Sequence, residues 1–441
     1  MKRGRWSAVK VGGSRSSGFL SAPFACDTPR VNINALKVLG VVTATLCGGA
    51  TISACSPIVR PDATGGGGTG ATSTGTEASS TSSGGGAAST SSVGGAGSTT
   101  TASGTTGTGL NCMGAEIACP GGCADIVNDG ANCGACGHSC QGGACVAGAC
   151  QPVTVVKALA SARELAIDGK SIYWTDTTAG TVSAVPLGGG APLQLATVSA
   201  AWAIATDGAN VYATEYLTMG GVFSVPVGGG ATITLAANQG RPCSIAVGAP
   251  GSGWVYFANQ YAGDVSKARI DGTGSKLFAA GQGAPPGVAA DVDYVYWTDG
   301  SNPGTVKQGP VGGGSPVLLA GGQPFPLAIT TDATNVYWTN QGNTMLGDGS
   351  VMMIPKAGGS AITIADLQTA AWHLAVDGTN VYWTTSEAGG SVMSAPVGGG
   401  AAKTIATGQS YPSGIAVDAT AIYWTNLGSG AGDGAVMKLA R

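Results

Sequence analysis

Hydrophobic and polar positions alternate in short runs from about residue 152 to residue 441, and turns rich in Gly, Asn and Asp separate these runs. One unit reads LAVD (374–377), the turn GTN, VYWT (381–384), a variable loop, SVMSAPV, the turn GGG and AKTIAT. Alternation between Gly/Asn turns is typical of β-hairpins. We therefore predict four antiparallel strands in each unit.

The unit recurs along the chain, and a tyrosine marks the same position in every copy. Successive tyrosines are 39 to 45 residues apart: Tyr173, Tyr212, Tyr256, Tyr296, Tyr337, Tyr382 and Tyr423. An aspartate stands five residues before six of them, and only the third copy has Gly248 instead. Four strands in about 40 residues form one propeller blade. The prediction is an all-β, seven-bladed β-propeller over 152–441, with six or eight blades as alternatives.

The two ends of the repeat region are complementary. The last copy stops after its third strand, at residues 436–439, whereas residues 153–159 have the pattern of a fourth strand without neighbours. We expect this N-terminal strand to complete the last blade. Such a latch would leave no open sheet edge at the closure.

The tetrads YWTD at Tyr173 and Tyr296 and YWTN at Tyr337 and Tyr423 resemble the YWTD propellers of lipoprotein receptors. The resemblance spans the repeat region. It departs in the second and third copies, which read YATE and YFAN, and in the copy number, because that family usually has six blades. It implies that the aromatic residues pack between blades and that the polar pair fixes loops.

Strand order separates the two faces of the predicted propeller. The aspartate turns and the GGG turns share one face, and the variable loops and the entries to the inner strands lie on the other. Residues four and five before the repeat aspartate, or its equivalent in copy three, should ring the channel mouth there. They are Arg163, Glu164, Trp202, Ala203, Cys243, Ser244, Pro286, Gly287, Leu327, Ala328, Trp372, His373, Ser413 and Gly414.

Five members of this ring form a possible ligand rim: Arg163, Glu164, Trp202, Trp372 and His373. Indole rings can stack on a sugar, and the ionisable groups can orient a small polar ligand. The alternative is that these residues simply plug the channel.

Catalytic residues are scarce. The chain has two histidines, His138 and His373, so no histidine cluster can hold a metal and a Ser/His/Asp triad would rest on His373 alone. Propeller hydrolases and lactonases surround a cation with several acids, whereas the ring offers Glu164. We predict a non-enzymatic binding or interaction scaffold without cofactor or metal; the alternative is a metal-assisted hydrolase or lactonase. A calcium site near Asp348 or Asp433 is a further alternative.

Composition excludes one class of partner. Glycine supplies 77 residues and charged residues 10% of the chain, against about 7% and 25% in average proteins, which favours turns and weakly charged strands. The net charge of −3 and the pI near 5.4 provide no basic face for phosphates. We expect no nucleic-acid partner, an unknown protein or glycan ligand, and a monomeric propeller.

A cysteine-rich module is predicted at residues 111–151. Its eight cysteines are Cys112, Cys119, Cys123, Cys133, Cys136, Cys140, Cys145 and Cys150. This density is typical of disulfide frameworks in oxidising compartments, with 105 possible pairings. Zinc bound by Cys133, Cys136, His138 and Cys140 is the alternative. The string NCGACGHSC resembles a cysteine-rich module of bacterial surface proteins, which implies a spacer. The remaining propeller cysteine, Cys243, is expected to be a buried small residue.

Residues 1–54 form a predicted signal region. Lys37 precedes an apolar stretch, and small residues then lead to Cys55, which is the order of a secretory signal. The string ISAC at 52–55 resembles the bacterial lipobox, whose cysteine is lipidated. Cleaved secretion and a retained membrane anchor are the alternatives. Because the first 30 residues include six Lys or Arg, Val31 is an alternative start.

Residues 55–110 form a predicted linker. Between Asp62 and Glu116 the only charged residue is Glu77, and almost all others are Gly, Ser, Thr or Ala, which cannot build a core. Ser56 follows the cysteine instead of the aspartate that resembles an inner-membrane retention signal. We expect an outer-membrane lipoprotein or a protein of the bacterial cell surface, in contact with the membrane through its lipid only; a secreted protein is the alternative.

Overall fold

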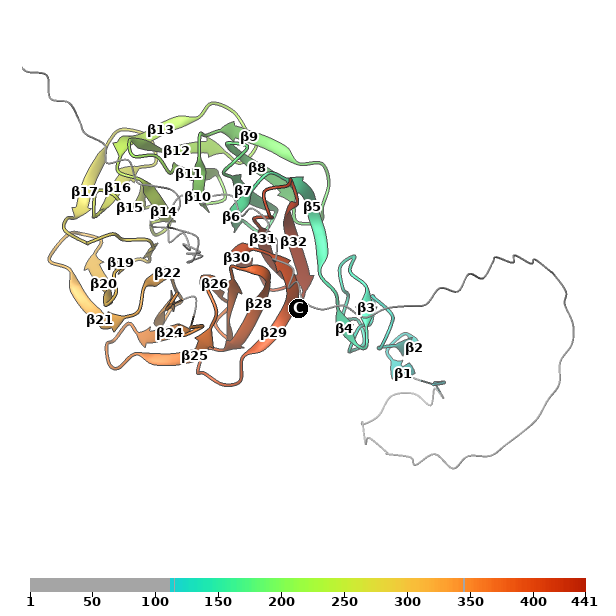
Figure 1. Ribbon diagram of the computed structural model, residues 1–441. Helices are drawn as coiled ribbons and strands as arrows, with labels where there is room; N and C mark the ends of the chain where they lie inside the picture. The colour runs from blue at the N-terminus through green and yellow to red at the C-terminus, as the bar shows by residue number, and fades with distance from the viewer. Residues whose placement is uncertain (1–111, 115, 344–345) are drawn as a thin grey trace, which may run out of the picture. The chain divides into compact units, whose positions relative to one another are not determined.

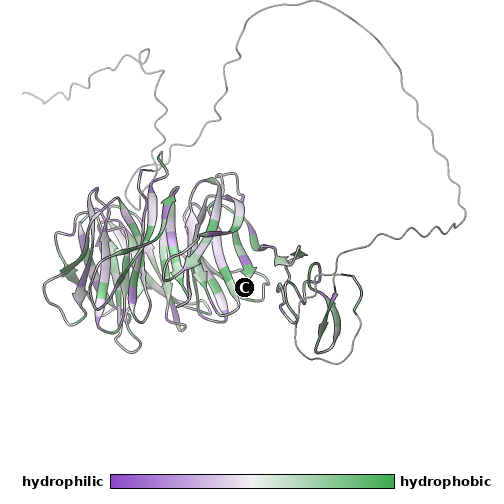
Figure 2. Cartoon of the chain, turned by 90° about the horizontal axis from the view of Figure 1, so that it is seen from below, coloured by the Kyte–Doolittle hydropathy of each residue, from purple (hydrophilic) through white to green (hydrophobic). Residues whose placement is uncertain are grey.

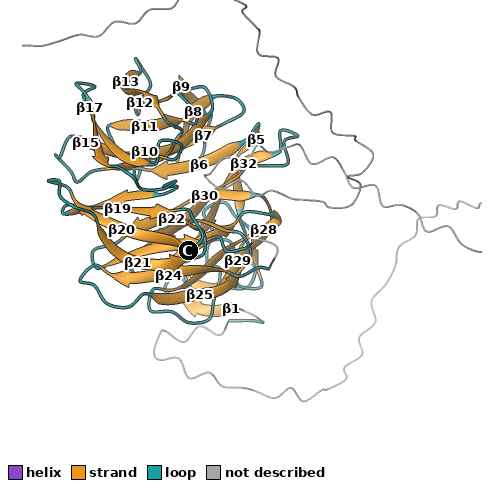
Figure 3. Cartoon of the chain, turned by 60° about the vertical axis from the view of Figure 1, so that its left-hand side comes forward, coloured by secondary structure: helices purple, strands orange, loops and turns teal. Residues whose placement is uncertain are grey.

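The computed structural model describes residues 112–114, 116–343 and 346–441. The predicted signal region, Cys55 and the linker lie outside these residues. Every regular element within them is a β-strand (Figure 3). In these ranges no helix has the length and apolar character needed to span a membrane.

Residues from Val153 onward form seven four-stranded antiparallel sheets arranged around a central axis, which confirms the seven-bladed propeller (Figure 1). Blade 1 comprises β6 (Ala162–Ile167), β7 (Ser171–Asp176), β8 (Thr181–Pro186) and β9 (Leu193–Thr197). Blade 2 comprises β10 (Ala201–Thr206), β11 (Asn210–Glu215), β12 (Gly220–Pro226) and β13 (Ile233–Gln239). Blade 3 comprises β14 (Pro242–Val247), β15 (Trp254–Asn259), β16 (Asp264–Arg269) and β17 (Ser275–Ala279).

The remaining blades repeat this order. Blade 4 comprises β18 (Val288–Ala290), β19 (Tyr294–Asp299), β20 (Gly304–Pro310) and β21 (Val317–Gln323). Blade 5 comprises β22 (Pro326–Thr331), β23 (Asn335–Asn340), β24 (Gly349–Pro355) and β25 (Ile362–Gln368). Blade 6 comprises β26 (Ala371–Val376), β27 (Asn380–Thr385), β28 (Ala388–Pro396) and β29 (Lys403–Ser410). Blade 7 comprises β30 (Pro412–Val417), β31 (Ala421–Asn426), β32 (Gly434–Ala440) and β5 (Val153–Leu159).

The ring is closed by the N-terminal strand. β5 pairs antiparallel with β32, with Val156 opposite Val436 and Val153 opposite Lys438. Blade 7 is therefore built from both ends of the repeat region, as the sequence predicted. Figure 1 shows β5 as the outermost strand of this blade.

The second strand of each blade supplies most of the core. Its tyrosine is at most 4% exposed in every copy, and in the five copies that have a tryptophan next to it that ring is at most 1% exposed. Hydrophobic and hydrophilic residues alternate along the strands in Figure 2. Burial of these large rings between adjacent sheets, at about 25 cal/mol per Å² of apolar surface, favours association of the blades.

Each repeat aspartate closes a turn and binds the repeat tyrosine. In blade 1, Asp168 Oδ1 accepts the amides of Lys170 and Ser171, and the Tyr173 hydroxyl donates to Asp168 Oδ2 at 2.7 Å. The same hydroxyl–carboxylate bond recurs at 2.7–3.1 Å in all six copies that have the aspartate. These aspartates are therefore structural turn residues, and Gly248 leaves blade 3 without this bond.

The repeat threonine joins five of the blades to the next one, and blade 3 has Ala258 in its place. In blade 5 the Thr339 hydroxyl accepts the amide of Ala328 in its own blade and donates to the carbonyl of Trp372 in blade 6 at 2.7 Å. In blades 4 to 7 the tryptophan indole N–H also donates to a glutamine that precedes the blade, as Trp338 does to Gln323 at 3.0 Å. The recurring polar residues thus hold neighbouring sheets together.

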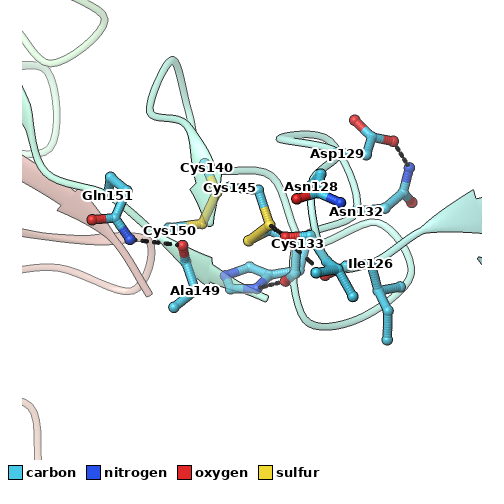
Figure 4. The surroundings of a disulfide bond; sticks show 12 residues. Ile126, Asn128, Asp129, Asn132, Cys133, Cys140, Cys145, Ala149, Cys150 and Gln151 are labelled. Atoms are coloured by element: carbon cyan, nitrogen blue, oxygen red, sulfur yellow. Dashed lines mark hydrogen bonds between the residues drawn. A yellow bond between two sulfur atoms is a disulfide. The ribbon is translucent and has the colours of Figure 1, made fainter. Parts of the chain in front are cut away.

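The region Cys112–Cys150 is held by four disulfides, between Cys112 and Cys123, Cys119 and Cys136, Cys133 and Cys145, and Cys140 and Cys150. Two of them are drawn in Figure 4. Two short hairpins, β1 (Glu116–Cys119) with β2 (Gly122–Asp125) and β3 (Cys145–Val146) with β4 (Ala149–Cys150), are its regular elements. All eight cysteines of this region are disulfide-bonded and have no thiolate to bind zinc, so the zinc alternative is wrong. Cys243 is free and buried, as expected.

Candidate functional site

The central channel contains a cavity of about 190 Å³. The innermost strand of each blade, or the residues directly before it, contributes to its wall. The lining residues are Glu164, Leu165, Ile204, Ser244, Ile245, Pro286, Gly287, Val288, Leu327, Ala328, Ile329, Thr330, His373, Leu374, Gly414 and Ile415.

A β-bulge at the start of most inner strands determines which side chains reach this cavity. In blade 1, Ala162 is opposite Asp176 and Leu165 is opposite Trp174, so one extra residue is accommodated between them. Blades 2, 5, 6 and 7 have the same register shift. A bulge interrupts the alternation of side chains between the two faces of a strand. Two consecutive positions, such as Glu164 and Leu165, can therefore both line the channel.

The second of these two positions forms an aliphatic ring that was not predicted from the sequence. It lies three residues before the repeat aspartate, or before Gly248 in blade 3. Its members are Leu165, Ile204, Ile245, Val288, Ile329, Leu374 and Ile415. The signal was present in the sequence, because only Leu, Ile or Val occurs there in all seven copies. This ring brings one aliphatic side chain from each blade to the wall, although polar atoms make up most of the exposed surface of the cavity.

Two ionisable side chains lie in the cavity wall beside the aliphatic ring. Glu164 of blade 1 and His373 of blade 6 both line the cavity, and Glu164 Oε1 lies 3.4 Å from His373 Nε2. Their side chains are 17% and 21% exposed. The Ile204 amide also points to Glu164 Oε2, at 3.4 Å. The structure thus brings together two of the five residues of the predicted rim.

The pair is uncharged at neutral pH. Burial raises the pKa of Glu164 to about 8, although the charge of Arg163 and the Ile204 amide act in the opposite direction. Burial, together with the positive charge of Arg163, lowers the pKa of His373 to about 3. A protonated carboxyl group and a neutral imidazole therefore face the channel at pH 7. Both can exchange hydrogen bonds with a ligand.

The other three residues of the predicted rim do not line the cavity. Arg163 is 5% exposed, and its guanidinium carbon lies 3.1 Å from the ring centroid of Trp202. The opposite face of that indole stacks on Tyr216, with ring centroids 4.0 Å apart and planes at 20°. Trp202 is therefore enclosed between two side chains, and its face is covered.

Trp372 is likewise buried, at 6% exposure, and belongs to the hydrophobic core. The expectation that Trp202 and Trp372 offer open stacking faces at the channel mouth is therefore wrong. The physical reason is the position of both residues between blades, where their own carbonyls accept the repeat threonine of the preceding blade.

Of the fourteen positions predicted to ring the mouth, eight line the cavity. They are Glu164, Ser244, Pro286, Gly287, Leu327, Ala328, His373 and Gly414. The remaining six are Arg163, Trp202, Ala203, Cys243, Trp372 and Ser413, all of them buried.

The loops considered for calcium are closed by their own backbone. Asp348 Oδ1 accepts the amide of Asn343, and Asp433 Oδ1 accepts the amide of Ser429 at 2.7 Å. Within residues 112–114, 116–343 and 346–441, one group of three or more His, Cys, Asp or Glu side chains is compact enough to share a metal ion. It consists of Cys133, Cys140 and Cys150, which are all disulfide-bonded.

No family model matches the chain, and no curated protein matches it. Among solved structures, virginiamycin B lyase from Staphylococcus aureus is similar at 14% identity and a TM-score of 0.55, covering 66% of this chain and 98% of that one. A streptogramin B lyase structure is similar at 12% identity and a TM-score of 0.54, covering 66% and 97%. A nidogen/laminin complex is similar at 20% identity and a TM-score of 0.43, covering 52% and 90%. At these identities the lyase structures support the propeller fold alone.

Proposed function

We propose that this chain is a non-enzymatic lipoprotein of the bacterial cell envelope whose propeller binds a small ligand in its central channel. The observation that carries the binding proposal is the uncharged Glu164–His373 pair, which lies beside a ring of aliphatic side chains in the wall of the cavity. Apolar pockets with a few convergent polar groups are the usual form of small-molecule sites.

The channel indicates the chemistry of the ligand. A cavity of about 190 Å³ accommodates a compact molecule. The aliphatic ring favours an apolar body, and the carboxyl and imidazole groups favour one hydrogen-bonding group on that body. A charged ligand would have to lose its hydration in this wall, which is costly without a counter-charge. We therefore expect a small neutral amphiphile.

The envelope part of the proposal rests on other features. Cys55 ends a lipobox-like string, and residues 55–110 have the composition of a flexible tether. Four disulfides in the region Cys112–Cys150 are typical of proteins outside the reducing cytosol.

The ligand proposal is tested by a thermal-shift screen of the full chain against small neutral amphiphiles, followed by calorimetry of each hit. Binding should weaken at least tenfold in Ile329→Glu, which introduces a charge into the aliphatic ring. Thr363→Glu provides a matched control, because it adds the same charge at an exposed position on β25. Equal loss of affinity in both variants, or hits that are unaffected by Ile329→Glu, would contradict binding in the channel.

A metal-assisted hydrolase or lactonase is the alternative. The observation in its favour is the same acid–imidazole pair, because a protonated carboxyl group and a neutral imidazole can act as general acid and base. Ester or lactone turnover that requires a divalent cation and is lost in both Glu164→Gln and His373→Gln would support this alternative over the binding scaffold.

A further inference from the structure

Blade 3 differs from most of the other blades at four neighbouring positions, which the register of the sheets aligns. Gly248 takes the place of the turn aspartate. Trp254 begins the second strand, where the other blades have Ser, Asn, Tyr or Ala. Arg269, opposite Trp254, replaces a proline that five blades share. Lys276 occupies a position that is aliphatic in five blades.

These substitutions collect positive charge around one indole. The Arg269 guanidinium carbon lies 4.8 Å from the Trp254 ring centroid, and the Nζ atoms of Lys267 and Lys276 lie 4.9 Å and 6.0 Å from it. Arg269 and Lys276 are exposed, and Trp254 and Lys267 are half-buried. Three of the twelve lysines and arginines from Val153 to Arg441 thus converge on a single ring.

Without a bound anion, the like charges of this cluster destabilise the fold. Lys267 and Lys276 are directly opposite each other on β16 and β17, and like charges in that relation are destabilising. Burial lowers the pKa of Lys267, and the charge of Lys276 lowers it further. None of the three ion pairs among the described residues includes Lys267, Arg269 or Lys276. Asp271 bonds to Thr273 within its own turn, and the charge of Arg269 contributes to the lowered pKa of Asp271, so this carboxylate offsets part of the charge of the cluster.

In blade 7 the lysine at the equivalent position has a nearby carboxylate. Lys438 is opposite the repeat tyrosine, as Lys267 is in blade 3. It donates to the Leu187 carbonyl of the next blade at 3.3 Å, and Lys267 donates to the Val311 carbonyl at 3.2 Å. Burial lowers the pKa of Lys438, but the negative charge of Asp418 opposes this shift. In blade 3 the position of that aspartate is Gly248, so the carboxylate is missing.

We propose that Trp254, Lys267, Arg269 and Lys276 form a second ligand site, which binds a phosphate or sulfate group carried on a sugar ring. The exposed guanidinium and ammonium groups would hold the oxyanion through charge-assisted hydrogen bonds. Where the oxyanion draws Arg269 and Lys276 away from the ring, the half-buried indole would give the sugar ring a planar apolar surface to stack on. The site lies at the turn end of blade 3, beside the turn of blade 4 that contains Val311.

The test is calorimetric titration of the full chain at low ionic strength with glucose 6-phosphate, glucose 6-sulfate, inorganic phosphate and glucose. We expect both sugar esters to bind, inorganic phosphate to bind more weakly and glucose to give no heat. Arg269→Gln and Lys276→Gln should each weaken binding about tenfold, the effect of one charge-assisted hydrogen bond. Trp254→Leu should remove the preference for the sugar esters over inorganic phosphate.

Lys403→Gln is the matched control, because Lys403 holds the position of Lys276 in blade 6 but faces Ser394 instead of a lysine. It should leave binding unchanged. Equal losses in Lys276→Gln and Lys403→Gln, or no heat with any oxyanion, would overturn the proposal. Binding of inorganic phosphate as tight as that of the esters would overturn the role of Trp254. Glu164→Gln should retain binding, which separates this site from the channel. Circular dichroism checks that each variant folds.

Discussion

Thr175 shows how one side chain joins two blades. Its hydroxyl accepts the amide of Glu164 in its own blade and donates to the carbonyl of Trp202 in the next blade. Both partners lie at the bulge, so the same bond also orients the residues that line the channel. The polar residue is buried with both of its hydrogen-bonding functions satisfied, which is the condition for a polar group to stabilise a core.

Glu164 and His373 give the stability of the propeller a pH dependence. Glu164 has a folded pKa of about 8 against an ordinary 4.5, so the folded state binds more protons in this window and stability falls as the pH rises through it. His373 has a folded pKa of about 3 against an ordinary 6.5, so stability falls as the pH drops through that window. Between about pH 4.5 and 6.5 the loss of stability with rising pH due to Glu164 and the gain due to His373 oppose each other. We therefore predict a plateau there, with losses on either side.

This prediction is measured by urea unfolding from pH 4 to pH 9. Glu164→Gln should reduce the loss on the alkaline side, and His373→Gln should reduce the loss on the acid side. Protonation of the repeat aspartates also destabilises the fold in acid, because their pKa values are lowered in the folded state. Comparing the unmodified protein with each variant therefore isolates the contribution of Glu164 and His373. An alkaline limb that is unchanged in Glu164→Gln would contradict the raised pKa.

At the scale of elements, β5 is the strand that departs from the repeat. In blades 5, 6 and 7 the tryptophan indole donates to a glutamine fifteen residues earlier, at the end of the preceding blade's outer strand. For Trp174 the equivalent residue is Leu159 at the end of β5, which pairs with Gly434 as Gln323 pairs with Gly304. The Trp174 indole N–H is buried without a hydrogen-bond partner among the described residues.

We predict that Leu159→Gln stabilises the closure. The new amide would accept the Trp174 indole N–H, and a buried hydrogen bond of this kind contributes about 1 kcal/mol to the free energy of unfolding. Urea unfolding measures the change, and Lys157→Gln on the same strand is the control at an exposed position. A loss of stability in Leu159→Gln would mean that the packing of the leucine outweighs the hydrogen bond.

The elements could be predicted from the sequence because their signals are local. Tyrosine spacing, turn aspartates and Gly-rich turns are read within one copy, and the unpaired strand at 153–159 follows from counting them. Side-chain direction at the bulge could not be predicted, because one extra residue breaks the alternation on which the prediction of the rim relied. That is why Glu164 and His373 lie in the channel, whereas Trp202 and Trp372 lie between blades.

At the scale of the whole molecule, the disulfide-rich region leads directly into the propeller. Cys150, bonded to Cys140, is three residues from the start of β5 and packs against the core of blades 6 and 7. Gln141 donates to the Thr420 carbonyl at 3.0 Å, and His138 Nε2 lies 2.6 Å from the Arg441 carbonyl oxygen. These contacts attach the disulfide-rich region to the same blades that β5 closes.

We predict that Cys55 determines where the protein is found. In a bacterial host the unmodified chain should sediment with membranes and require detergent for release, because a diacylated N-terminus partitions into lipid. Cys55→Ala should lose the acyl group, as mass spectrometry of the N-terminal peptide would show, and should not enter the detergent fraction as a lipoprotein. Cys47→Ala is the control, because Leu46 does not fit the residue expected before a lipidated cysteine. Equal membrane association of the two variants would contradict lipidation at Cys55.

The closure by β5 also decides how the propeller would respond to mechanical force. A pull on the chain before Val153 reaches the propeller through the outermost strand of blade 7, along the direction of that strand. The hydrogen bonds between β5 and β32 would then be loaded together in shear and not broken one after another. Once the contacts of His138 and Gln141 with the propeller have given way, the strand that closes the ring bears the load, and its rate of detachment would set how long the propeller resists a sustained pull.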